Sequence, residues 1–71
     1  MSEITKIRLL AMLDNELEQV AGMISKERLW AQGSATEEEW QAHLENAVDL
    51  KEYNELLVQI RKKVVEGDLN V

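Results

Sequence analysis

The chain has 71 residues and a net charge of −6, with an apolar fraction of 45% beside a charged fraction of 31%. A chain of this length holds one domain near the lower limit for independent folding, and the composition excludes a disordered tail. Proline and cysteine are both absent, which argues against a turn-rich sheet protein and excludes disulfides and thiolate zinc sites. We expect one all-α domain over residues 1–71 that needs no cofactor and no metal.

The first predicted helix spans about residues 3–31. Ser2 can cap its first turn, and apolar residues follow at steps of three and four, as on one side of a helix. These core-stripe residues are Ile7, Leu10, Leu13, Leu17, Val20, Ala21 and Ile24. Such a stripe is typical of a helix that packs along one partner helix.

A second, sparser stripe runs along the same helix. Met12, Met23 and Trp30 are spaced by eleven and seven residues, and Leu9 lies between them and the core stripe. Helical spacing predicts an angle of about 160–180° between the two stripes. Either the helix has two neighbours, or these adaptable side chains form a partner-binding surface. The two interpretations merge if the neighbour is a second copy of the chain.

The turn is predicted over residues 32–36. Gly33 can adopt the left-handed conformation that closes a helix. Thr36 and Glu39 form a capping box, in which the hydroxyl accepts from the backbone N–H three residues later and the carboxylate reaches back. Three consecutive glutamates then suit the positive end of the next helix dipole. We expect the chain to fold here into an antiparallel helical hairpin.

The second predicted helix spans about residues 37–66, followed by a short tail over residues 67–71. Leu56, Val58 and Val65 lie off its seam, so this helix also carries more apolar surface than one contact needs. Asp49 with the glutamate three residues later has the form of a second capping box. This leaves open a kink near Asp49 that would make a three-helix domain. The expected seam residues are Trp40, Leu44, Ala47, Leu50, Tyr53, Leu57, Ile60 and Val64.

The surplus apolar residues of both helices predict self-association. An isolated antiparallel pair buries only one seam, which is a small core for a chain without disulfides or metal. Packing two hairpins together would bury the surplus residues. We therefore expect a homodimeric four-helix bundle. Its candidate interface residues are Leu9, Met12, Met23, Trp30, Leu56 and Val65.

Charge is distributed unevenly along the expected hairpin. Acidic residues dominate the turn and the middle, whereas five of the eight basic residues gather at the open end. Matching of the helix dipoles and a solvated surface explain this distribution. The functional alternative is a small anion or nucleic-acid contact at the basic end, although a net charge of −6 argues against bulk binding to nucleic acid. The five basic residues are Lys6, Arg8, Arg61, Lys62 and Lys63.

Groups that could carry catalysis are few. His43 is the only histidine, and with Glu39 four residues before it the helix offers two ligands, too few for a closed metal site. We expect His43 to lie in or beside the seam. The chain has no cysteine nucleophile and no phosphate-binding glycine loop. Trp30 and Trp40 flank the turn and are expected to pack together.

The sequence thus predicts a non-enzymatic protein–protein interaction module, such as an adaptor, inhibitor or regulatory subunit, that acts as a helical homodimer. Its expected partners are a second copy of the chain and another protein. Two alternatives stay open. One is a nucleic-acid-associated module, which binds through the basic end or imitates nucleic-acid charge through the acidic faces, and the other is a purely structural oligomer. We expect a cytoplasmic location, because the sequence shows neither a signal peptide pattern nor the roughly 18 apolar residues of a membrane span.

Overall fold

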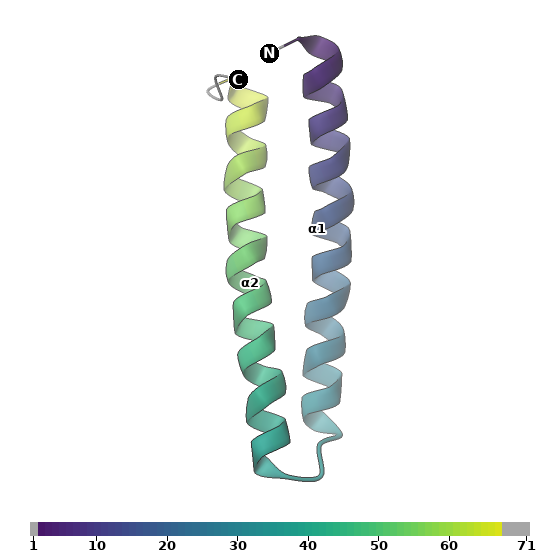
Figure 1. Ribbon diagram of the computed structural model, residues 1–71, viewed down its shortest axis with the longest axis vertical. Helices are drawn as coiled ribbons and strands as arrows, with labels where there is room; N and C mark the ends of the chain where they lie inside the picture. Colours follow the sequence, from purple (N-terminus) through teal and green to yellow (C-terminus); the bar gives the residue numbers. More distant parts are fainter. Residues whose placement is uncertain (1, 68–71) are drawn as a thin grey trace.

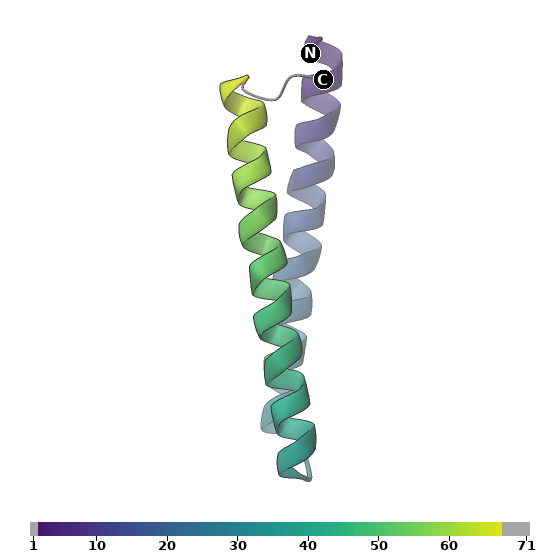
Figure 2. The same cartoon turned by 60° about the vertical axis from the view of Figure 1, so that its left-hand side comes forward.

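Two long antiparallel helices make up nearly all of the described structure. A computed structural model describes residues 2–67, with α1 at Glu3–Gln32 and α2 at Glu37–Glu66. The helices run side by side along their length, with the start of α1 beside the end of α2 (Figure 1, Figure 2). The predicted all-helical hairpin is therefore confirmed. Residues 68–71, most of the predicted tail, lie outside the described residues.

Both helices begin at the caps that the sequence predicts. Ser2 Oγ accepts a hydrogen bond from the Thr5 N–H at 3.1 Å, and Thr36 Oγ1 accepts from the Glu39 N–H at 3.2 Å. The Glu39 carboxylate also accepts from the Ala35 N–H at 3.2 Å. These bonds satisfy backbone donors that a helix start leaves unpaired. Local side-chain chemistry thus determines where each helix begins.

The two helices end differently. Gly33 has φ −90°, so the prediction that it closes α1 in the left-handed conformation is wrong. Instead, Ser34 Oγ donates to the Trp30 carbonyl at 2.8 Å and the Ser34 N–H donates to the Ala31 carbonyl at 3.2 Å. These two bonds satisfy carbonyls at the helix end without a left-handed residue. Gly67 closes α2 with φ 78°, a conformation that strains any residue with a Cβ.

The core is a single narrow seam between the helices. Its buried cluster consists of Leu13 and Val20 of α1 with Leu57 and Val64 of α2. Each pair is seven residues apart, so its members project from the same side of their helix. Partly buried leucines and one isoleucine extend the seam along both helices: Leu9, Leu10, Leu17, Ile24 and Leu50.

The seam of α2 differs in phase from the predicted seam. Tyr53 and Ile60, which the sequence places inside it, are exposed, whereas the residues that follow them, Asn54 and Arg61, are half-buried. The buried residue Leu57 and its equivalents seven residues away fix the inward side of the helix, and Asn54 and Arg61 lie beside that side. α2 continues as one helix through Asp49. Three other residues predicted to be in the core, Trp40, Ile7 and Ala21, are also exposed.

The hairpin exposes more surface than a compact protein of its mass. Its radius of gyration is 15.9 Å, whereas a compact domain of this length has a radius of about 11 Å. Its accessible surface is 5550 Å², against about 4500 Å² for a compact monomer of 8.2 kDa. The surface that a single hairpin exposes includes large apolar residues of both helices, among them Met12 and Leu56.

Candidate interaction surface

Six of the thirteen large apolar residues that are exposed in the described structure lie on one broad side of the hairpin, three from each helix. Met12 of α1 precedes the buried Leu13 by one residue, and Leu56 of α2 precedes the buried Leu57. Each therefore points about 100° away from the seam, in the same rotational sense along its own helix. Two antiparallel helices are related by an approximate twofold axis perpendicular to the plane that contains them. Residues with the same offset from the seam consequently project to the same side of the pair.

Contacts between the helices support this assignment. Met23 of α1 and Tyr53 of α2 line the same shallow depression, and the Tyr53 hydroxyl donates to Glu16 Oε1 at 3.3 Å. Partial burial, followed by the charge and the hydrogen bond of Glu16, raises the pKa of Tyr53 above its ordinary value of 10.0. We call this side the methionine face. It consists of Leu9, Met12, Met23 and Trp30 of α1 with Tyr53, Leu56 and Ile60 of α2.

The methionine face lies closer to the seam than the sequence predicts. Met12 and Trp30 each precede a buried residue by one position, which places them about 100° from the seam rather than 160–180° away. At this angle the stripe of α1 and the exposed residues of α2 share one side. Tyr53 and Ile60 therefore belong to the face, although the sequence assigns them to the seam. The signal that identifies them is the seven-residue repeat of buried residues in α2, which marks the inward side.

Val65 does not share the methionine face. It follows the buried Val64 by one residue, so it projects to the opposite side of the hairpin. Val48 and Val58 follow buried residues in the same way, and with Val65 they form what we call the valine face. Five of the six candidate interface residues thus lie together, and one lies apart.

The valine face is apolar mainly along α2, because α1 adds to it only the exposed Ile7, seven residues before Asp14. On this side α1 contributes charged residues: Asp14 Oδ1 accepts a hydrogen bond from Arg61 Nε at 2.6 Å. Arg28 of α1 and Lys51 of α2 line a depression together with Val48. The methionine face, in contrast, receives large apolar residues from both helices.

A polar cluster closes the turn end of the methionine face. Glu27 Oε2 lies 2.6 Å from His43 Nδ1, and it accepts from Asn46 Nδ2 at 3.5 Å. The ring of His43 lies 5.8 Å from that of Trp30, with an angle of 52° between the planes. Among residues 2–67, Trp30 thus pairs with His43 and not with Trp40 as predicted. His43 lies beside the seam, where the sequence predicts it.

The five basic residues lie in the first two turns of α1 and the last two of α2, which meet at the open end of the hairpin (Figure 1). Arg61 is held by Asp14, whose hydrogen bond and then charge raise the pKa of the guanidinium above its ordinary value. Lys62 Nζ lies 4.0 Å from Glu66 Oε1. Carboxylates of the same chain therefore pair with two of the five basic residues, which favours a solvated, ion-paired surface over an anion site at this end.

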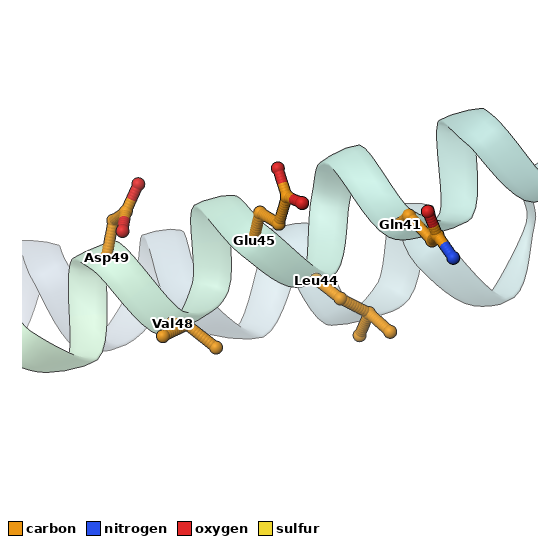
Figure 3. A pocket seen from close by; sticks show the side chains of 5 residues that line it. All are labelled: Gln41, Leu44, Glu45, Val48 and Asp49. Atoms are coloured by element: carbon orange, nitrogen blue, oxygen red, sulfur yellow. The ribbon is translucent and has the colours of Figure 1, made fainter.

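A further depression lies on the outer side of α2. Its lining residues all come from one helix: Gln41, Leu44, Glu45, Val48 and Asp49. Leu44 and Val48 point to one side, whereas Glu45 and Asp49 point to the other (Figure 3). Side chains that diverge in this way do not enclose a small molecule in the manner of a ligand pocket. This surface offers an apolar contact with an acidic rim.

Neither a metal site nor a membrane span occurs within residues 2–67. No group of three or more His, Cys, Asp or Glu side chains in this region is arranged to hold a metal ion. Neither helix is apolar enough over a sufficient length to cross a membrane. Comparison of the chain with protein-family models, with curated proteins and with solved structures finds no significant match.

Proposed function

We propose that this protein is a small, non-enzymatic interaction module that acts as a helical homodimer, in which two hairpins pack into a four-helix bundle. The observation that carries the proposal is the methionine face, to which both helices contribute large apolar residues. In the single hairpin Met12 is 61% exposed and Trp30 is 53% exposed. Methionine and tryptophan are enriched at protein interfaces, where their side chains adapt to a partner surface.

The dimensions of the hairpin support a dimer. One broad side measures 51 by 16 Å, a footprint close to the roughly 800 Å² that each partner buries in a stable specific interface. The hairpin has more accessible surface than a compact monomer of the same mass, and covering this side would remove most of that excess area. Four helices around one core would then replace the single seam of the hairpin.

The dimer would bind a further protein through the surfaces that it leaves in water. The valine face of each hairpin and the outer side of α2 around Leu44 and Val48 carry exposed or half-buried apolar residues beside charges. Surfaces of this composition suit an adaptor, an inhibitor or a regulatory subunit, which act by binding rather than by chemistry. Self-association is therefore the first property to test.

The test compares two matched double variants of α1. Met12→Lys with Met23→Lys places two cations on the methionine face. Ile7→Lys with Leu29→Lys, the control, changes two exposed apolar residues elsewhere on α1 and adds the same charge. At about 1 kcal/mol for each of the four methionine positions in a dimer, the first variant should raise the dissociation constant about 1000-fold. The control should change it by less than about tenfold.

Sedimentation equilibrium measures the dissociation constants, and circular dichroism at matched concentrations shows whether the helices persist. A large effect of the methionine variant beside a small effect of the control supports the proposal. Equal weakening of the dimer by both variants would overturn the proposal, because the methionine face would then contribute no more to association than other exposed residues of α1. A wild-type chain that stays monomeric would overturn it as well.

A further inference from the structure

We propose that the second copy packs on the methionine face in the antiparallel orientation, so that the open end of each hairpin lies against the turn end of the other. The inference rests on the proposed function, since it presupposes a dimer. It adds the direction and the register of the two hairpins, and it identifies the contacts that specify them.

Charge complementarity carries the direction. The open end, residues 3–9 and 59–66, has five basic and two acidic residues, a net charge of +3. The turn end, residues 26–45, has two basic and five acidic residues, a net charge of −3. Antiparallel packing sets opposite charges against each other at both ends of the dimer, whereas parallel packing sets like against like at both ends. Complementary potentials favour the first arrangement, and like charges suppress the second.

The methionines specify the register. α1 spans Glu3–Gln32, and Met12 and Met23 lie at equal distances from its midpoint. When two copies of α1 pack antiparallel with full overlap, Met12 of each copy therefore faces Met23 of the other. The flexible thioether side chains can fill this contact, which occurs twice by symmetry.

Parallel packing would lose the methionine contact. An axis along the hairpin would place α1 of one copy against α2 of the other. The contacts of Glu16 with Tyr53, Glu27 with His43 and Asp14 with Arg61 across the hairpin place Ile60 of α2 about level with Met12. A parallel dimer would thus set Met12 of one copy near Ile60 of the other, so the charges of the two ends, rather than the apolar contacts, decide the direction.

The acidic residues of α2 complete the antiparallel contact. α2 spans Glu37–Glu66, and full overlap brings Lys63 of one copy level with Trp40 of the other. Glu38 and Glu45 flank Trp40 along the chain and, by helical spacing, project on the same side of α2 as Lys63. Each end of the dimer would then pair a lysine with two glutamates at the rim of the apolar contact.

Distance measurement between two spin labels tests the orientation. The chain has no cysteine, so Ala35→Cys gives a single labelling site on the exposed loop between the helices. In the antiparallel dimer the two labels lie at opposite ends, separated by nearly the 51 Å length of the hairpin. In a parallel dimer they would lie within about 20 Å, or two helix diameters.

A second label reports dimer formation independently of orientation. Lys51→Cys lies in the middle of α2 on an exposed position and, like Val58 seven residues later, faces away from the methionine face, so two labels there are much closer than the hairpin length in either arrangement. A long distance at position 35 with a short one at position 51 supports the proposal. Short distances at both positions would overturn the antiparallel orientation and leave the homodimer intact. No dipolar coupling at either position would overturn the homodimer itself.

Discussion

Gly22 allows a direct test of which side of α1 stays in water. It follows the buried Val20 by two residues and therefore points away from α2. A methyl group at this position would meet no atom of the chain within 4 Å. Alanine in a helix interior is more favourable than glycine by about 1 kcal/mol. Gly22→Ala should therefore raise the free energy of unfolding by about 1 kcal/mol, or the melting temperature by about 4–8 °C for a domain of this size.

The assay is thermal unfolding followed by circular dichroism at one fixed concentration, because the melting temperature of an associating protein depends on concentration. Gly67→Ala is the matched control. Its left-handed φ of 78° should make the same substitution destabilising by about 1 kcal/mol. A lower melting temperature or weaker association for Gly22→Ala would contradict the exposed position of Gly22, because a neighbouring chain would then have to pack closely against this side of α1.

Three further predictions follow from single contacts. Leu57→Ala should lower the free energy of unfolding in urea by about 2–3 kcal/mol, because it truncates a core side chain. Leu56→Ala should mainly weaken association in sedimentation experiments. Equal effects of the two variants on unfolding would contradict the assigned seam. Thr36→Ala should cost about 1 kcal/mol by removing the cap of α2, measured in the same way, and an unchanged stability would contradict the cap. Tyrosinate absorbance should place the pKa of Tyr53 above 10.0, and Glu16→Gln should move it only partly back, since burial is the largest cause; an unmoved midpoint would count against the hydrogen bond. The stability that neutral Tyr53 contributes is present below pH 10.0 and is lost as the pH rises through the raised pKa.

The hairpin itself could be predicted because its signals are local. Ser2 and Thr36 cap backbone groups within three residues of themselves, so the start of each helix needs no knowledge of packing. The end of α1 at Gly33 could not be predicted in the same way. A glycine after a helix permits the left-handed conformation, but the Ser34 hydroxyl satisfies the Trp30 carbonyl without it.

The phase of the α2 seam could not be read from apolar spacing alone. Tyr53 and Ile60 continue the three- and four-residue steps as well as the true seam positions do, and they are more apolar than Asn54 and Arg61. The structure places the polar pair beside the core because α1 covers the side of α2 that carries Leu50, Leu57 and Val64. The rotation of α2 against α1 thus decides the phase, and that rotation has no signature in the spacing of one helix.

Most residues of the candidate surface could be predicted from the sequence, but their arrangement into one surface could not. The stripe of Met12, Met23 and Trp30 is visible in the sequence, but its continuity with Leu56 depends on how the second helix is rotated against the first. Val65 is as apolar as Leu56, but it lies on the other side of the hairpin, because it follows a buried residue whereas Leu56 precedes one. Only the relative rotation of the two helices separates these residues.

Both proposals depend on a second copy of the chain that covers the methionine face. Light scattering of the wild-type protein across a concentration series, with helix content followed in the same samples, measures this most directly. We expect a particle of twice the 8.2 kDa chain mass that persists over the range in which the protein is helical. A cooperatively folded particle of the single-chain mass at high micromolar concentration would contradict it.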